Sequence, residues 1–140
     1  FDCDVIIGLG VHSGDHEIYP DCRPEFYSAL DIAFKLGNWG SERISFHLPY
    51  LSGNKKTILL DALNSCKELD LEFDIIFKNT NTSYNPDLQG RSSGKSGADI
   101  ERILAFYEIG RKDPVEYTKD WNEVLNNALM IKKEHDDLNE

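Results

Sequence analysis

A polar, turn-rich stretch at residues 8–26 gathers the side chains best suited to hold a small charged ligand. The planar guanidinium of Arg23 can bind a carboxylate or a phosphate through two parallel hydrogen bonds. A carboxylate such as Asp15 or Asp21 can accept hydrogen bonds from the ring N–H and amino group of a guanine-like base, and Tyr19 can stack on such a ring. These four residues are therefore candidates for substrate binding.

A purely structural role is open for the same side chains. Asp21 and Arg23 could pair with each other or cap the helix that Pro24 begins. Residue chemistry alone favours neither role. Asn79 and Asn81, whose amides carry paired donors and acceptors, are secondary candidates for reading the edge of a base.

The polar stretch lies between a strand and a helix. Residues 4–8 form a short, apolar, β-branched run of the kind that a buried parallel strand needs. Pro24 begins an amphipathic helix that ends near Gly37. In open α/β sheets such loops lie at the carboxyl ends of the strands, where ligands bind. Gly10 and Gly14 can let another backbone approach the loop closely.

The next segment repeats the order of strand, loop and helix. Residues 43–48 alternate polar and apolar like a strand. A helix capped by Ser52 or Asn54 then extends to about Leu69. This order is typical of a parallel α/β unit with right-handed crossovers, so we predict an α/β fold with a parallel sheet and flanking helices.

The second half of the chain is expected to be helical around one long polar loop. Residues 70–78 fit a strand and a helix about equally, and we favour a helix that ends in a loop. Residues 79–97 form a loop too long for a simple connector. Ser96 and Asp99 predict a capping box for the next helix. The apolar face of that helix is predicted to contain Ile100, Ile103, Leu104 and Tyr107.

A last helix is predicted from a cap at Asp120, followed by a charged, solvated and frayed tail at residues 131–140. No internal repeat or linker is found, so residues 1–140 are predicted to form a single domain. The chain begins almost inside a strand. This start predicts the C-terminal portion of a longer protein, or one part of a split protein.

The composition narrows the classes of partner. The net charge of −10 argues against a nucleic-acid ligand, because binding a phosphate backbone requires a basic face. No apolar run approaches the roughly 20 residues of a membrane span. The three cysteines have no regular spacing, which favours a reducing compartment, and we expect a cytoplasmic protein. A small molecule or another protein is the expected partner.

Several motifs together resemble one enzyme family. Residues 19–26 read Tyr-Pro-Asp-Cys-Arg-Pro-Glu-Phe, after Gly-Val-His-Ser-Gly-Asp-His at residues 10–16. Tyr-Asn-Pro-Asp follows at residues 84–87, and Glu-Arg-Ile-Leu-Ala-Phe at residues 101–106. In this order they resemble the C-terminal half of the 7-cyano-7-deazaguanine synthases of queuosine and archaeosine biosynthesis. The resemblance covers residues 4 to about 117.

The resemblance implies an ATP-dependent carbon–nitrogen ligase with the PP-loop fold, which is Rossmann-like and related to the adenine nucleotide α-hydrolases. Such an enzyme uses ATP and Mg to activate the carboxylate of 7-carboxy-7-deazaguanine as an acyl adenylate. Ammonia then displaces AMP to give an amide, which a second activation dehydrates to a nitrile.

The pyrophosphate loop of that family, Ser-Gly-Gly-x-Asp-Ser, does not occur in these 140 residues. The resemblance therefore implies a substrate-side half that is inactive by itself. It would need an N-terminal half or a partner chain that carries the loop. No residue of this chain is assigned a catalytic role.

Many members of the family hold a structural zinc ion with four cysteines. The corresponding positions here are Ser83, Ser93, Ser96 and Asp99. A serine hydroxyl stays protonated at neutral pH and binds zinc poorly, so this set cannot form a thiolate cage. We predict no structural zinc, and we expect a softer loop than in relatives that keep the metal.

Two other functions remain open on the sequence. The chain could be a non-catalytic binding or assembly module derived from the same fold. It could also belong to a related PP-loop ligase that acts on another carboxylate. The sequence leaves the oligomeric state open, a homodimer included.

Overall fold

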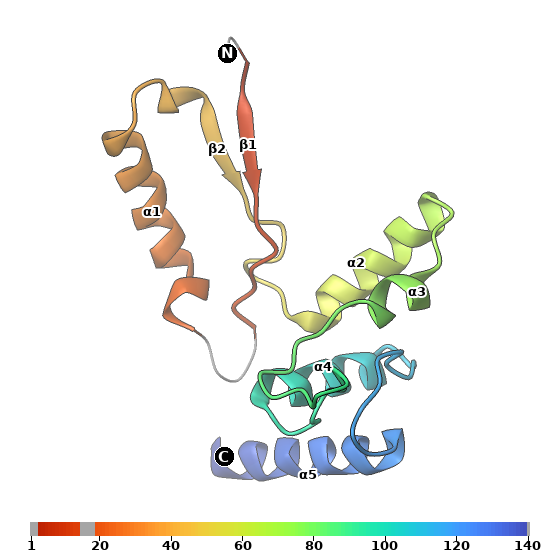
Figure 1. Ribbon diagram of the computed structural model, residues 1–140. Coiled ribbons are helices and arrows are strands. Elements are labelled where there is room, and N and C mark those ends of the chain that lie inside the picture. The colour runs from red at the N-terminus through yellow and green to blue at the C-terminus, as the bar shows by residue number, and fades with distance from the viewer. Residues whose placement is uncertain (1–2, 15–18, 140) are drawn as a thin grey trace. The chain divides into compact units, whose positions relative to one another are not determined.

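The structure is a computed structural model that describes residues 3–14 and 19–139 (Figure 1). In chain order its elements are β1 (Val5–Gly8), η1 (Pro20–Cys22), α1 (Pro24–Gly37), η2 (Ser41–Arg43), β2 (Ile44–His47), α2 (Lys55–Glu68), α3 (Phe73–Lys78), α4 (Gly97–Glu108) and α5 (Trp121–Asn139). The chain divides into two compact units, Phe1–Thr57 and Ile58–Glu140, where the sequence analysis predicts a single domain.

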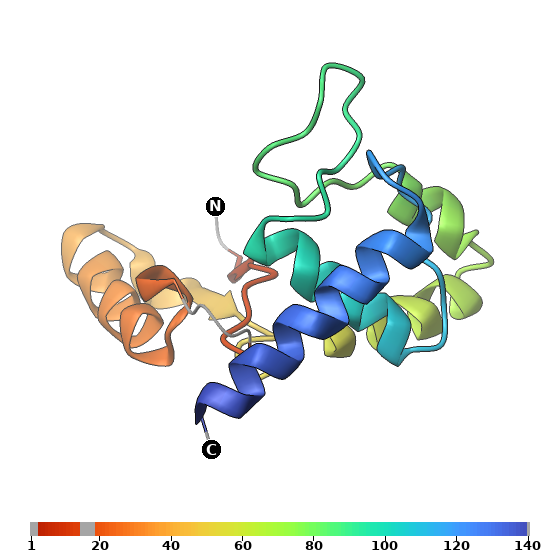
Figure 2. The same ribbon diagram turned by 90° about the horizontal axis from the view of Figure 1, so that it is seen from below.

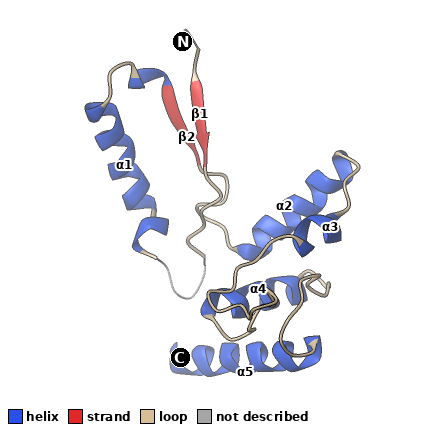
Figure 3. Ribbon diagram, viewed as in Figure 1, coloured by secondary structure: helices blue, strands red, loops and turns tan. Residues whose placement is uncertain are grey.

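The first unit is built on two parallel strands joined by a helix, which confirms the predicted α/β order (Figure 3). The register of β1 and β2 places Val5 opposite Ile44. Phe34 of α1 packs edge to face on Phe46 of β2, with the ring centroids 5.9 Å apart. The helix that connects the strands is thus also the one that packs on them.

The prediction that the first strand is buried is wrong. Val5 is 42% exposed and Ile6 is 69% exposed. Successive side chains of a strand point to opposite faces of the sheet. Because only two strands are paired within the described residues, neither face of β1 is covered at these positions.

The loop after β1 runs against the loop after β2. Ser13 donates two hydrogen bonds to the Leu51 carbonyl, from its backbone N at 3.1 Å and from its Oγ at 2.6 Å. A Cβ on Gly14 would lie 2.4 Å from the Gly53 carbonyl oxygen, so the predicted close approach occurs there. The same prediction is wrong for Gly10, since no described atom lies within 4 Å of a Cβ built on it.

The helices begin at the caps that the sequence predicts. The Asn54 side chain accepts a hydrogen bond of 3.0 Å from the backbone N–H three residues later, so Asn54 rather than Ser52 caps α2. Ser96 and Asp99 form the capping box of α4. Asp120 accepts from the first backbone N–H groups of α5. Each cap satisfies donors that the first helical turn leaves unpaired.

Helix α4 forms the core of the second unit by packing in two directions. One buried cluster contains Leu59, Cys66, Phe73, Ala105 and Phe106, and the other contains Ile100, Ile103, Leu104, Val124 and Ala128. The prediction that Tyr107 lies on the buried face is wrong, because Tyr107 is 49% exposed whereas Phe106 is fully buried. The prediction assumes one apolar face at helical spacing, but this helix packs against other elements on two sides, so a single face does not describe its buried residues.

Two further segments complete the second unit. Residues 73–78 are helical, as favoured from the sequence, and residues 79–96 form the long loop that leads into α4 (Figure 2). The charged tail predicted at residues 131–140 is helical as far as residue 139, where α5 ends. No helix in the described part of the chain is long and apolar enough to cross a membrane.

We predict that Phe106→Ala lowers the unfolding free energy of the second unit by about 3–5 kcal/mol, because it empties a site packed against two aromatic rings of α3. The matched control is Tyr107→Ala, which should cost about 0.5 kcal/mol. Urea unfolding would be followed by the fluorescence of Trp121 in a Trp39→Phe background, since the chain has two tryptophans. Equal losses in the two variants would contradict the packing described here.

Candidate functional site

Three of the predicted site residues, Tyr19, Asp21 and Arg23, lie together on one turn of the first unit. The Tyr19 carbonyl accepts a hydrogen bond of 2.9 Å from the Cys22 N–H. Arg23 has an extended backbone, with φ −87° and ψ 145°, and stands between η1 and α1. Pro24 enforces this break because a proline disfavours the helical conformation of the residue before it. All three predicted side chains are exposed.

Neither structural role considered for the charged pair is present. Among the described residues, Asp21 and Arg23 form no ion pair with each other or with another side chain. No side-chain hydrogen bond caps α1. Burial raises the pKa of the Tyr27 hydroxyl, and the nearby Cys22 and Asp21 raise it further. Asp15, the fourth predicted residue of this stretch, lies outside the described residues.

The two predicted asparagines line a cavity of about 280 Å³ in the second unit. Asn79 follows α3, and its Nδ2 donates a hydrogen bond of 2.7 Å to the Ile75 carbonyl. Asn81 lines the same cavity, together with Lys78 and Arg91. The predicted site residues therefore fall into two groups, one in each unit.

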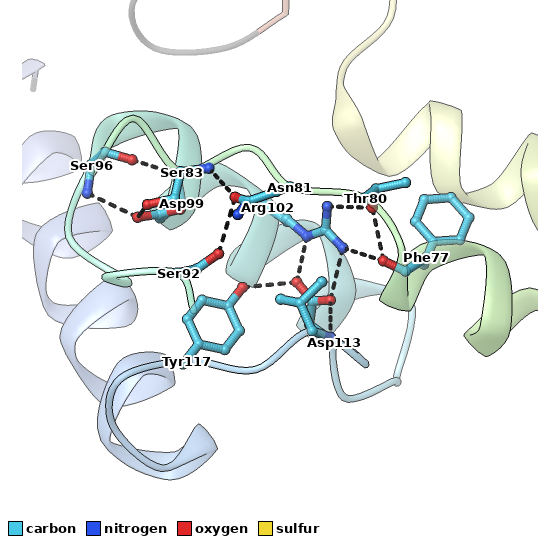
Figure 4. A network of polar contacts seen from close by, with 11 residues as sticks. Phe77, Thr80, Asn81, Ser83, Ser92, Ser96, Asp99, Arg102, Asp113 and Tyr117 are labelled. Atoms are coloured by element: carbon cyan, nitrogen blue, oxygen red, sulfur yellow. Dashed lines mark hydrogen bonds and ion pairs between the residues drawn. The ribbon is translucent and has the colours of Figure 1, made fainter. Parts of the chain in front are cut away.

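Asn81 uses both ends of its amide to hold the long loop, and Figure 4 shows its contacts with Ser83 and Ser92. Its Oδ1 accepts from the Ser83 N–H at 2.7 Å and from the Ser92 hydroxyl at 3.3 Å. Its Nδ2 donates to the Gly90 carbonyl at 3.2 Å. A base edge would compete for the same amide atoms. Substrate binding by Asn81 stays a prediction, beside a loop-holding role that the geometry shows.

A buried ion pair joins α4 to the segment before α5 (Figure 4). Arg102 is 5% exposed and Asp113 is 1% exposed. The guanidinium donates two hydrogen bonds to the carboxylate, of 2.6 and 3.0 Å. It also donates to the Thr80 hydroxyl at 2.8 Å and to the Phe77 carbonyl at 3.1 Å. One side chain thus fixes α4, the end of α3 and the approach to α5.

This network is not predicted from the sequence. Its only signal was Arg102 itself, a charged residue between the apolar Ile100 and Ile103. A charge inside an apolar helix face requires a buried partner. With 25 acidic residues in the chain, the sequence could not say which one that partner is.

Tyr117 extends the pair by donating a hydrogen bond of 2.8 Å to Asp113. Burial raises the pKa of Tyr117 far above its ordinary value of 10.0. The charge of Asp113 and its hydrogen bond with the hydroxyl raise the pKa further. The Tyr117 hydroxyl is therefore a neutral donor throughout the physiological pH range.

The four positions at which the family resemblance places zinc-binding cysteines meet at one buried point (Figure 4). The Asp99 side chain is fully buried. Its Oδ2 accepts from the hydroxyls of Ser83 at 3.0 Å and Ser93 at 2.8 Å. It also accepts from the backbone N–H of Ser96 at 3.4 Å. The Ser96 hydroxyl in turn accepts from the Asp99 N–H at 3.2 Å.

This donor set does not fit a structural zinc ion. Such sites use thiolate and imidazole ligands, and neutral hydroxyls are poor replacements. Here the protons of Ser83 and Ser93 are directed at the carboxylate that would be the one charged ligand. Within the residues that the structure describes, there is also no group of three or more histidine, cysteine or acidic side chains able to hold a metal ion.

Comparison of the sequence with known protein families identifies the class of protein to which this chain belongs. Residues 2–110 match the family model described as "Queuosine biosynthesis protein QueC". The chain belongs to this family, which confirms the resemblance drawn from its motifs. No solved structure gives a significant match.

Curated proteins similar to this chain include two that are named 7-cyano-7-deazaguanine synthase. The chain is 43% identical over 108 residues to the protein of Marinomonas sp. (strain MWYL1), covering 77% of this chain and 44% of that protein. It is 42% identical over 118 residues to the protein of Methanoregula boonei, covering 79% of this chain and 49% of that one. The chain thus spans less than half the length of these relatives.

We predict that the unfolding free energy of the second unit falls as the pH rises above 10. The unfolded tyrosine ionises near 10.0, whereas folded Tyr117 resists ionisation, so the stabilisation is complete below that pH and is lost above it. Tyr117→Phe should remove this part of the pH dependence. Urea titrations between about pH 8 and 11, followed by Trp121 fluorescence, measure both proteins. An identical pH dependence in both would contradict the prediction.

Proposed function

We propose that the protein to which this chain belongs converts 7-carboxy-7-deazaguanine and ammonia to 7-cyano-7-deazaguanine in an ATP-dependent reaction of queuosine or archaeosine biosynthesis. Membership of the QueC family and the name shared by the curated relatives support this activity. The chain covers the part of those relatives that we assign to the substrate side.

The observation that carries the proposal is an exposed turn whose two charges of opposite sign, Asp21 and Arg23, form no ion pair with a described residue. They lie in η1 and directly after it, between β1 and α1. Exposed charges without a partner keep their hydrogen-bonding groups available to a ligand. An exposed pair at the carboxyl end of a strand is where α/β proteins bind ligands.

The three side chains of the turn match the functional groups of the proposed substrate. Arg23 would hold the substrate carboxylate through its fork of N–H groups. Asp21 would accept from the ring N–H and amino group of the deazaguanine, and Tyr19 would stack on the ring. Since these groups bind and orient without forming covalent bonds, their contribution is positioning.

The ATP-handling part of the proposed reaction is not assigned to this chain. No Ser-Gly-Gly-x-Asp-Ser sequence occurs in its 140 residues, so we derive no step through ATP or Mg. We propose that another segment or chain supplies that loop and further strands of a PP-loop fold. The uncovered side chains of Val5 and Ile6 support such a larger sheet, because parallel strands are normally buried on both faces.

We predict that the 140 residues alone make no nitrile. Mass spectrometry would measure 7-cyano-7-deazaguanine after incubation with 7-carboxy-7-deazaguanine, ATP, Mg²⁺ and ammonia. Adding the N-terminal half of a curated relative that carries the pyrophosphate loop should produce the nitrile and AMP. Nitrile from the isolated chain would refute the half-enzyme role. No turnover with the added half would favour a binding module, and AMP release indifferent to the substrate would favour a ligase for another carboxylate.

We predict that Arg23→Ala weakens binding of 7-carboxy-7-deazaguanine by the completed protein about 10- to 100-fold, the range expected for loss of hydrogen bonds to a charged group. Arg23→Lys should restore part of the affinity, because lysine keeps the charge but loses the paired geometry. Lys35→Ala is the matched control, since it removes a positive charge from an exposed pair on α1. Calorimetric titration measures all three, and an effect of Lys35→Ala equal to that of Arg23→Ala would contradict the assignment.

A further inference from the structure

The long polar loop closes on a single buried atom. Ser83 stands in the first part of the loop, Ser93 and Ser96 stand at its end, and Asp99 belongs to the first turn of α4. Their hydrogen bonds converge on Asp99 Oδ2. The carboxylate is fully buried, and its other oxygen, Oδ1, has no hydrogen-bond partner among the described residues, so the donors on Oδ2 are what replaces its lost hydration. The loop conformation and the carboxylate therefore depend on each other.

We propose that the Asp99 carboxylate replaces a metal ion as the centre of this loop, so that the second unit folds without zinc. In a four-thiolate site, the backbone presents anionic sulfur atoms to a central cation. Here neutral hydroxyl groups are presented to a central anion. The charges are thus reversed: the centre is an anion instead of a cation, and the groups around it are neutral donors instead of anions. The same four positions still meet.

The surroundings of the serines support this exchange. The Ser83 hydroxyl accepts the backbone N–H groups of Asn85 at 3.4 Å and Ser93 at 3.3 Å. The Ser93 hydroxyl accepts the N–H of Lys95 at 3.3 Å. Each of the two hydroxyls thus receives backbone protons and donates its own proton to Asp99. A zinc ion would have to displace those donated protons before it could bind.

Packing on α5 holds the same turn in place. Gly94 has a left-handed backbone with φ +69°, and a Cβ at this position would lie 2.8 Å from Val124 Cγ1. The turn that carries Ser93 and Ser96 is therefore pressed against α5. Apolar packing and hydrogen bonds together fix the loop with no ion required.

The first experiment measures zinc directly. The full chain is produced without an affinity tag in zinc-supplemented medium, and its metal content is determined by plasma mass spectrometry. We expect no stoichiometric zinc and no change in the midpoint of thermal unfolding when a strong zinc chelator is added. One zinc ion per chain, with a lower midpoint after chelation, would overturn the proposal.

The second experiment places cysteines at the four positions. The variant S83C/S93C/S96C/D99C should bind one Co²⁺ per chain with the charge-transfer absorption of a tetrahedral four-thiolate site, and zinc should raise its unfolding midpoint. The unmodified chain, with Cys3, Cys22 and Cys66, is the control for background binding. A folded variant that binds no cobalt would contradict the claim that these four positions meet at one point.

The third experiment does not require the four-cysteine variant to fold. Asp99→Ala should lower the unfolding midpoint by about 10 °C or more, because it removes the acceptor shared by the two half-buried hydroxyls of Ser83 and Ser93. Asp99→Asn should lower it less, since the amide keeps one acceptor oxygen. Asp120→Ala is the matched control, as it removes a carboxylate that caps α5 but lies outside the cluster. Equal shifts for Asp99→Ala and Asp120→Ala would overturn the proposal.

Discussion

The second unit depends on the buried ion pair between Arg102 and Asp113. The guanidinium holds the carboxylate through two hydrogen bonds, and its remaining donors reach the end of α3. An unpaired charge at this depth would destabilise the protein strongly, so every contacting segment must be in place before α4 can be buried. The pair therefore links three segments that are far apart in sequence into one cooperative structure.

Helix α4 carries a second buried charge one turn before the first. Asp99 and Arg102 are both nearly inaccessible. The loop of residues 79–96 donates hydrogen bonds to Asp99 Oδ2, whereas Asp99 Oδ1 has no partner among the described residues, and Thr80 of the loop accepts a hydrogen bond from Arg102. A long polar loop is usually a flexible connector. Here the loop has a defined conformation because it supplies the donors and acceptors that a buried acid and a buried base need. In the sequence, the polar side chains of the loop suggest a solvated segment. In the structure, several of them form hydrogen bonds with the buried side chains of Asp99 and Arg102.

The first unit contains side chains that its own fold does not use. Its two-stranded sheet leaves apolar side chains uncovered, and the side chains of Asp21 and Arg23 form no ion pair or hydrogen bond with a described residue. Binding sites often retain groups that the fold itself does not use. The family to which the chain belongs, and its coverage of less than half of the curated relatives, fit a unit that other residues complete.

Local sequence determined most of the elements of this protein. Capping side chains, Pro24 and the apolar periodicity marked helix starts and the strand–helix–strand order, because these signals act within one or two turns. Only the tertiary structure decided which charges are buried and where they pair. Arg102 finds Asp113 eleven residues away, and Ser83 finds Asp99 sixteen residues away. Such partners depend on how α4 is covered from two sides, which also placed Phe106 inside and Tyr107 outside, and no local pattern contains that information.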